Sequence, residues 1–182
     1  MKFLKQLFIL IVSIIALVLL IALFVEKEYD INRSIIVNKS QSEVFSFVKP
    51  LENSGKFAVW QKKDPNIKQT YSGESGKVGS TYTWSSKIED IGSGEQEIKS
   101  IIENEKIVCE LRFKSPNEMI AESYMTTSSI DNSSKTKVVW GIKGGSAYPW
   151  NFFMLFFDLD AQIGPDLQEG LDNLKVVMET ND

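Results

Sequence analysis

Histidine is absent from this sequence, and cysteine occurs once, as Cys109. Without histidine the chain can form neither a Ser-His-Asp triad nor a Cys-His pair, and no histidine-ligated metal site. A single cysteine excludes an internal disulfide and a zinc site made of several cysteines. We expect neither a metal ion nor another cofactor.

Positive charge is also scarce. The 182 residues include 20 Lys and Arg against 24 Asp and Glu, which gives a net charge of -4. Because nucleic-acid binding requires an excess of positive charge, we expect no nucleic-acid partner. The hydrophobic share of 43% and the charged share of 24% are typical of a folded globular protein, and the length suits one domain.

The N-terminal part of the chain differs from the rest. Residues 7–25 form an apolar run in which Ser13 is the only polar residue. As a helix this run would be roughly 28 Å long, close to the thickness of the hydrocarbon core of a bilayer. We therefore expect a transmembrane anchor over residues 1–25 and a separate domain over residues 26–182.

Two other interpretations of this run stay open. A cleaved signal peptide requires small residues before the cut, and residues 21–25 offer no good site. A buried core helix is the second, although an unbroken apolar helix in this position rarely belongs to a core. Lys2 and Lys5 precede the run and favour a cytoplasmic N-terminus with the domain outside the cytoplasm, while Lys27 beyond the run weakens that charge difference.

Seven segments of the remaining chain are predicted strands, because they alternate in polarity or are rich in β-branched residues between turn residues. The last six follow one another at short intervals, which predicts an antiparallel meander. The polar residues 131–134 form the predicted turn before the final strand. The predicted strands are 29–37, 67–72, 79–86, 95–103, 106–114, 119–130 and 136–143.

Two helices are predicted around these strands. Ser40 stands three residues before Glu43, which is the spacing of a capping box and predicts the start of a short helix. Leu167 and Leu171 belong to an apolar stripe with helical spacing near the C-terminus. Pro165 suits the first turn of a helix, so we expect the C-terminal helix to begin there.

Five short segments fit this order of strand, helix, six strands and long helix. They are RSIIVN (33–38), VF (44–45), VGSTYTW (78–84), KVVW (137–140) and IGPDLQEGLDNLK (163–175). Together they resemble the START/SRPBCC superfamily, and within it the polyketide cyclase/dehydrase and lipid-transport group, including bacterial members with one N-terminal membrane segment. The resemblance implies the α+β helix-grip fold, a curved seven-stranded antiparallel sheet around a long C-terminal helix. It also implies a cavity for an apolar or amphipathic ligand, without fixing one reaction.

One face of each strand would line such a cavity, because side chains alternate between the two faces of a strand. Trp60 lies in the irregular segment 52–66, where this fold often has its entrance. For each of these residues, simple packing in the core is the alternative role. The candidate ligand-binding residues are Trp60, Tyr82, Trp84, Cys109, Leu111, Phe113, Val138, Trp140, Phe153, Leu167 and Leu171.

Residues 148–157 are the most aromatic stretch of the chain, and three roles are open for them. They can form a gate over the cavity, a patch that contacts the membrane, or a helix packed against the sheet. On a helix, Phe152, Phe153, Phe156 and Phe157 form one wide stripe, as a buried helix requires. We therefore favour packing against the sheet.

We identify no catalytic residue. Glu95 and Glu97 share a strand face, as do Glu110 and Arg112, but apolar residues on the opposite faces direct both pairs towards solvent. Glu122 is the remaining candidate for a polar group inside the cavity.

The sequence as a whole favours a membrane-tethered domain that binds a small hydrophobic or lipid-like molecule between the sheet and the C-terminal helix. A polyketide cyclase/dehydrase-type enzyme is one alternative, and it requires an ionisable group with a perturbed pKa inside the cavity. A regulatory protein-interaction module is the other, and it predicts a cavity filled by side chains together with an exposed apolar patch.

Overall fold

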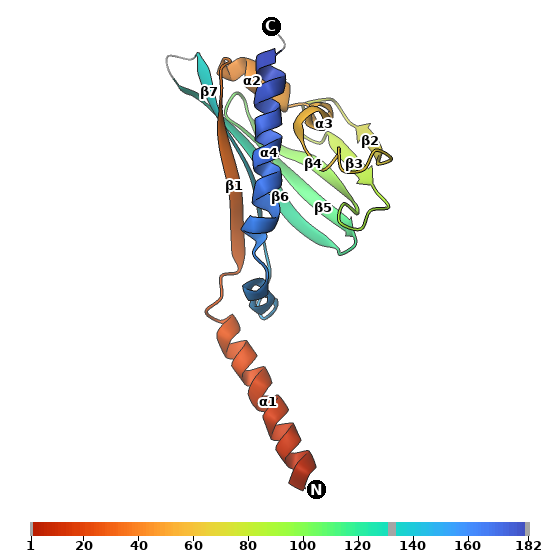
Figure 1. Cartoon of the computed structure of the whole chain (residues 1–182), viewed down its shortest axis with the longest axis vertical. Coiled ribbons are helices and arrows are strands. Elements are labelled where there is room, and N and C mark those ends of the chain that lie inside the picture. Colours follow the sequence, from red (N-terminus) through yellow and green to blue (C-terminus); the bar gives the residue numbers. More distant parts are fainter. Residues whose placement is uncertain (1, 131–133, 181–182) are drawn as a thin grey trace.

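A computed structural model of the protein describes residues 2–130 and 134–180. A curved antiparallel sheet packs against one long C-terminal helix, and an apolar helix projects from the opposite end of the molecule (Figure 1). The predicted α+β architecture with seven strands is therefore confirmed. The strands are β1 (Glu28–Val37), β2 (Lys68–Ser72), β3 (Thr81–Ser85), β4 (Ser93–Ile102), β5 (Lys106–Ser115), β6 (Met119–Ile130) and β7 (Lys135–Gly145).

The sheet has the order β1-β7-β6-β5-β4-β3-β2, so the last strand returns to pair with the first. All neighbours are antiparallel. The strand ends differ from the predicted ones by only a few residues, because polarity alternates clearly along each segment. In β5, for example, Ile107, Cys109 and Leu111 are buried on the concave face. Residues 131–133 of the predicted turn lie outside the described residues.

Short helical segments connect β1 to β2 and β7 to the C-terminal helix. The predicted capping box is present, because Glu43 accepts from the backbone of Ser40 at 3.0 Å and donates its own amide to the Ser40 hydroxyl at 3.4 Å. The helices are α1 (Lys2–Ala22), α2 (Gln41–Val48), η1 (Leu51–Asn53), α3 (Ser54–Phe57), η2 (Trp150–Phe156) and α4 (Leu159–Thr180), of which η1 and η2 are 3₁₀ helices.

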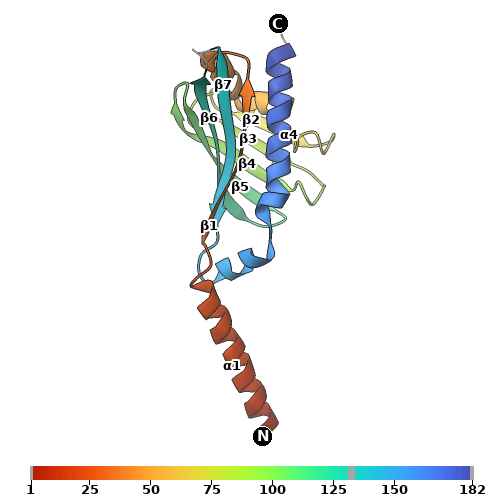
Figure 2. The same cartoon turned by 60° about the vertical axis from the view of Figure 1, so that its left-hand side comes forward.

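The C-terminal helix α4 begins earlier than predicted, at Leu159, and Pro165 lies inside it. Asp158 explains the earlier start, because its carboxylate accepts from the backbone of Ala161 at 2.9 Å and so caps the first turn. The helix packs along the concave face of the sheet (Figure 2). Leu167 and Leu171 of the predicted apolar stripe are fully buried there.

The aromatic stretch before α4 does not pack against the sheet, which corrects our preferred interpretation. It forms the 3₁₀ helix η2, and Phe153, Phe156 and Phe157 are exposed. The reason is its position, because the chain leaves β7 at the end of the sheet next to α1, and η2 lies beyond the sheet (Figure 2). No sheet face is therefore available at this level for η2 to cover.

Helix α1 is separate from the domain over most of its length (Figure 1). By length and composition it is long and apolar enough to cross a membrane, and its most apolar window is not buried against the rest of the chain. Its C-terminal end contacts η2, where the carbonyl of Ala22 accepts from the Asn151 side chain.

Candidate ligand-binding cavity

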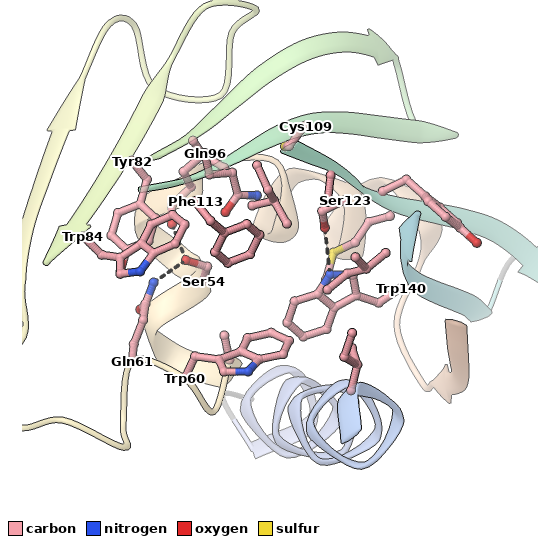
Figure 3. Close-up of a pocket in the computed structure, with 18 of the residues that line it drawn as sticks. Ser54, Trp60, Gln61, Tyr82, Trp84, Gln96, Cys109, Phe113, Ser123 and Trp140 are labelled. Atoms are coloured by element: carbon pink, nitrogen blue, oxygen red, sulfur yellow. Dashed lines mark hydrogen bonds between the residues drawn. The ribbon is translucent and has the colours of Figure 1, made fainter. Parts of the chain in front are cut away.

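A cavity of about 330 Å³ lies between the concave face of the sheet, the segment after α2, and α4. In Figure 3, side chains from the strands and from residues 54–61 point into one common space beside α4, which is seen end-on. The volume lies at the lower end of the range for pockets that hold small molecules. Most of the lining is apolar, so the cavity suits an apolar ligand.

One wall of the cavity is a row of aromatic rings on β3 and β5. Tyr82 and Trp84 are stacked with their ring centroids 5.8 Å apart, and Phe113 meets Trp84 edge-on at 5.6 Å. The indole nitrogen of Trp84 donates to the carbonyl of Ile91 at 3.2 Å, which satisfies its only polar atom. These rings are therefore held in place before any ligand binds.

The opposite wall is built around Trp140 of β7. Its ring makes edge contacts with Trp60 and with Phe57, in both cases at 5.5 Å between centroids. Its indole nitrogen donates to the Ser123 hydroxyl at 3.3 Å. Gly170 of α4 permits this arrangement, because a Cβ atom there would lie 2.6 Å from the Trp140 ring.

A few polar groups interrupt the apolar lining. The Gln61 amide donates to the Ser54 hydroxyl at 3.0 Å, and Ser54 donates in turn to the carbonyl of Leu51 at 2.7 Å. Gln96 and Ser123 lie on the strands facing this pair (Figure 3). Such groups orient a ligand rather than hold it, since apolar burial supplies most of the affinity in a pocket of this kind.

The buried side chains of Tyr82 and Cys109 in the lining stay neutral near pH 7. Burial raises the pKa of Tyr82 to about 12 and the pKa of the Cys109 thiol to about 11. Among the described residues of the lining, Asp90 is the only acidic or basic one, and it is exposed. The interior thus suits an uncharged or largely apolar molecule.

The structure brings together most of the predicted site residues, although contact of any of them with a ligand stays a prediction. Phe153 lies apart, on η2. Three others are fully buried in the core without lining the cavity, namely Val138, Leu167 and Leu171. Those that line the cavity are Trp60, Tyr82, Trp84, Cys109, Leu111, Phe113 and Trp140.

The polar part of the lining was not predicted from the sequence. Alternation places Gln96 on the same face of β4 as Ile98, and Ser123 beside Ala121 on β6, so the signal for these two was present. For Ser54 and Gln61 there was no such signal, because they lie in a connection without a regular period.

The outer face of the sheet carries the charges, as predicted. Arg112 pairs there with Glu95 and Glu110, and with Glu97 at 2.8 Å. These contacts with the guanidinium lower the pKa values of Glu95 and Glu97. Glu122 stands directly opposite Glu110 in the β5–β6 register, on the same outer face, and so lies outside the cavity.

No family model and no curated protein matches the sequence. Several solved structures match the fold. A protein from Nitrosospira multiformis has a TM-score of 0.60 and 15% identity, over 85% of this chain and 100% of that chain. The Aha1 dimer from Colwellia psychrerythraea has a TM-score of 0.56 and 18% identity, over 83% of this chain and 96% of that chain. Ara h 8.0201 has a TM-score of 0.54 and 10% identity, over 85% of this chain and 99% of that chain.

These structures show that the chain has the helix-grip fold. Their low sequence identity to this chain limits the comparison to the fold.

Proposed function

We propose that this protein is a membrane-tethered member of the START/SRPBCC superfamily that binds a small hydrophobic or lipid-like molecule between its sheet and α4. The observation that carries this proposal is the cavity of about 330 Å³ with aromatic walls and a few neutral polar groups. The helix-grip fold of the chain supports it.

Apolar burial would provide most of the binding free energy. Each 100 Å² of apolar surface that the ligand and the walls remove from water contributes about 2.5 kcal/mol before the costs of association. The polar groups of Ser54, Gln61, Gln96 and Ser123 would favour a ligand that carries a hydroxyl, carbonyl or amide group at one end.

The open cavity favours ligand binding over the other functions that fit the sequence. A protein-interaction module was predicted to have a cavity filled by side chains together with an exposed apolar patch, and the open cavity does not fit the first part of that prediction. An enzyme of the cyclase type was predicted to need an ionisable group with a perturbed pKa inside the cavity, and to act as an acid or base that group needs a pKa near neutral pH. The raised pKa values of Tyr82 and Cys109 have burial as their largest cause and leave both groups protonated, so they give no support to this alternative.

In this proposal the apolar run 7–25, most of which lies in α1, spans the membrane and keeps the domain near a source of lipid. Lys2 and Lys5 would lie on the cytoplasmic side and the domain on the other side. The length and hydropathy of α1 support the tether.

Native mass spectrometry of the full chain, extracted from its host membranes in mild detergent, tests the proposal. We expect a co-purifying apolar molecule with wild type, and its loss in Ala121→Phe, which places a ring inside the cavity. The matched control is Ile120→Phe, which adds the same ring to the exposed face of the same strand. Circular dichroism checks that both variants fold.

Two results would overturn ligand binding. One is a wild-type protein that is consistently empty and binds none of a panel of apolar dyes. The other is a bound molecule that a correctly folded Ala121→Phe variant retains in full.

A further inference from the structure

Helix η2 and its ends present a continuous apolar surface to solvent. Trp150 is 65% exposed and Phe156 is 67% exposed, although both are large apolar side chains. No residue between Lys143 and Asp158 is charged. We call this surface the η2 patch, and its exposed residues are Trp150, Phe153, Leu155, Phe156 and Phe157.

The η2 patch has a fixed position relative to α1. The fully buried side chain of Asn151 donates to the carbonyls of Ala22 and Val25, at 2.7 and 2.9 Å, where α1 ends. The hydroxyl of Tyr148 donates to the carbonyl of Leu19 at 3.4 Å. These bonds satisfy carbonyls that the end of a helix leaves without a partner, so they join η2 to α1.

The patch also continues the apolar surface of α1. Phe24, which is 83% exposed, lines one groove together with Leu155 and Phe157. The same groove is also lined by the acidic residues Glu26, Glu28, Asp30 and Asp160. In Figure 2, η2 lies crosswise to α1, between the end of α1 and the sheet. If α1 crosses a bilayer, η2 therefore lies at the level of the bilayer surface, with its axis close to the plane of the membrane.

We propose that the η2 patch is a membrane-interface seat that rests in the interfacial layer of the same bilayer that α1 spans. This inference depends on the tether in the proposed function and is independent of the cavity and its ligand. Aromatic side chains such as Trp and Tyr are enriched at this level of a bilayer, where their rings are stable between water and hydrocarbon. An apolar surface of short helical turns binds there by burying its rings at the boundary with the acyl chains.

The η2 patch itself carries no charge, so we expect it to bind the bilayer through apolar contacts and not through charged headgroups. Since no Lys or Arg lies within the η2 patch, the patch has no electrostatic attraction to an anionic lipid headgroup. The seat therefore forms on a zwitterionic bilayer, which carries no net charge.

Fluorescence quenching in phosphatidylcholine nanodiscs tests the seat with the full chain. In a Cys109→Ser background, single cysteines Leu10→Cys, Phe156→Cys and Val176→Cys carry an environment-sensitive dye. Leu10 lies within α1, Phe156 in the patch, and Val176 is an exposed residue near the far end of α4. We expect lipids with a nitroxide near the headgroup to quench the dye at 156, lipids with a nitroxide deep in the chain to quench the dye at 10, and neither to quench the dye at 176.

Each other outcome overturns the seat in a recognisable way. Quenching at 10 without quenching at 156 supports the membrane tether and overturns the proposed seat. A dye at 156 that is shielded from water only in discs with two copies assigns the patch to a second copy of the chain. Absence of quenching at 10 overturns the membrane tether and, with it, the seat. The proposal of ligand binding, which is tested by mass spectrometry, does not depend on this result.

Discussion

Cys109 shows how the cavity controls the chemistry of a single residue. Its thiol lies in the wall, and burial raises its pKa from 9.0 to about 11. Since the thiolate is the nucleophile, a shift of this size lowers the reactive fraction at pH 7 roughly a hundredfold. The same residue type on the surface of this protein would react readily.

We therefore expect Cys109 to react with a small uncharged maleimide at least tenfold more slowly than a cysteine at Val176 in a Cys109→Ser background. The reaction rates, followed by intact mass, provide the measurement. An apolar dye that occupies the cavity slows Cys109 further and leaves the control rate unchanged. Equal rates for Cys109 with and without the dye would contradict its position in the ligand site.

Arg112 organises the outer face of the sheet in a way that depends on pH. It lowers the pKa values of Glu95 and Glu97 below their ordinary value of 4.5. Because these folded-state pKa values are lowered, the stabilisation is fully present above about pH 4.5 and is lost as the pH falls through the lowered values. Without Arg112, the neighbouring carboxylates of Glu95, Glu97 and Glu110 repel one another.

For Arg112→Met we expect a loss of about 1 kcal/mol in the free energy of unfolding at pH 7, measured by urea denaturation. The difference from wild type should shrink as the pH is lowered below about 4.5, because the carboxylates become neutral in both proteins. Lys77→Met, which removes an exposed charge elsewhere, serves as the control. A loss that is the same at pH 7 and at pH 3 would disprove the electrostatic explanation.

At the scale of elements, Gly170 marks a close contact between α4 and the sheet. Gly170 lies against the Trp140 ring, and a Cβ atom there would lie 2.6 Å from it. The ring cannot easily move aside, because it also contacts Phe57 and Trp60. The glycine thus sets the distance between α4 and the sheet, and with it the width of the cavity.

We predict that Gly170→Ala destabilises the protein by about 1–3 kcal/mol in thermal or urea unfolding, since overpacking outweighs the gain of about 1 kcal/mol in helix propensity. Glu169→Ala, at an exposed position of the same helix, should change stability by less than about 0.5 kcal/mol. A Gly170→Ala variant more stable than wild type would show that α4 can move away from the sheet at no cost.

The elements differ in how well the sequence predicts them. The strands were predictable because one face of each meets the core and the other meets water, as in β5. The start of α4 was not, because proline favours the first turn of a helix, whereas here Pro165 lies further inside the helix, where it cannot donate a backbone hydrogen bond. For η2, a wide aromatic stripe fits a buried helix and an exposed one equally well, and only the position of η2 beyond the sheet distinguishes them. The cavity walls were predictable from alternation, whereas Gln61 depends on a connection without a period.

At the scale of the whole molecule, Asn151 fixes the orientation of the domain relative to α1. Its amide links η2 to the carbonyls of Ala22 and Val25. We expect Asn151→Leu to widen the distribution of distances between spin labels at Leu10→Cys and Val176→Cys, measured by pulsed electron paramagnetic resonance in nanodiscs. Ala147→Ser, on the exposed part of the same connection, should leave the distribution narrow. An unchanged distribution in Asn151→Leu would mean that other contacts fix the domain.

The continuation of α1 into β1 also has a mechanical consequence. Strand β1 follows α1 along the long axis of the molecule, and each of its ten residues is paired with β7 (Figure 1). The hydrogen bonds of an antiparallel pair run perpendicular to the strands. A force that pulls the domain away from α1 therefore acts along β1 and shears all of these bonds together, instead of opening them one after another. The strand that joins α1 to the domain is in this way the one best placed to resist their separation.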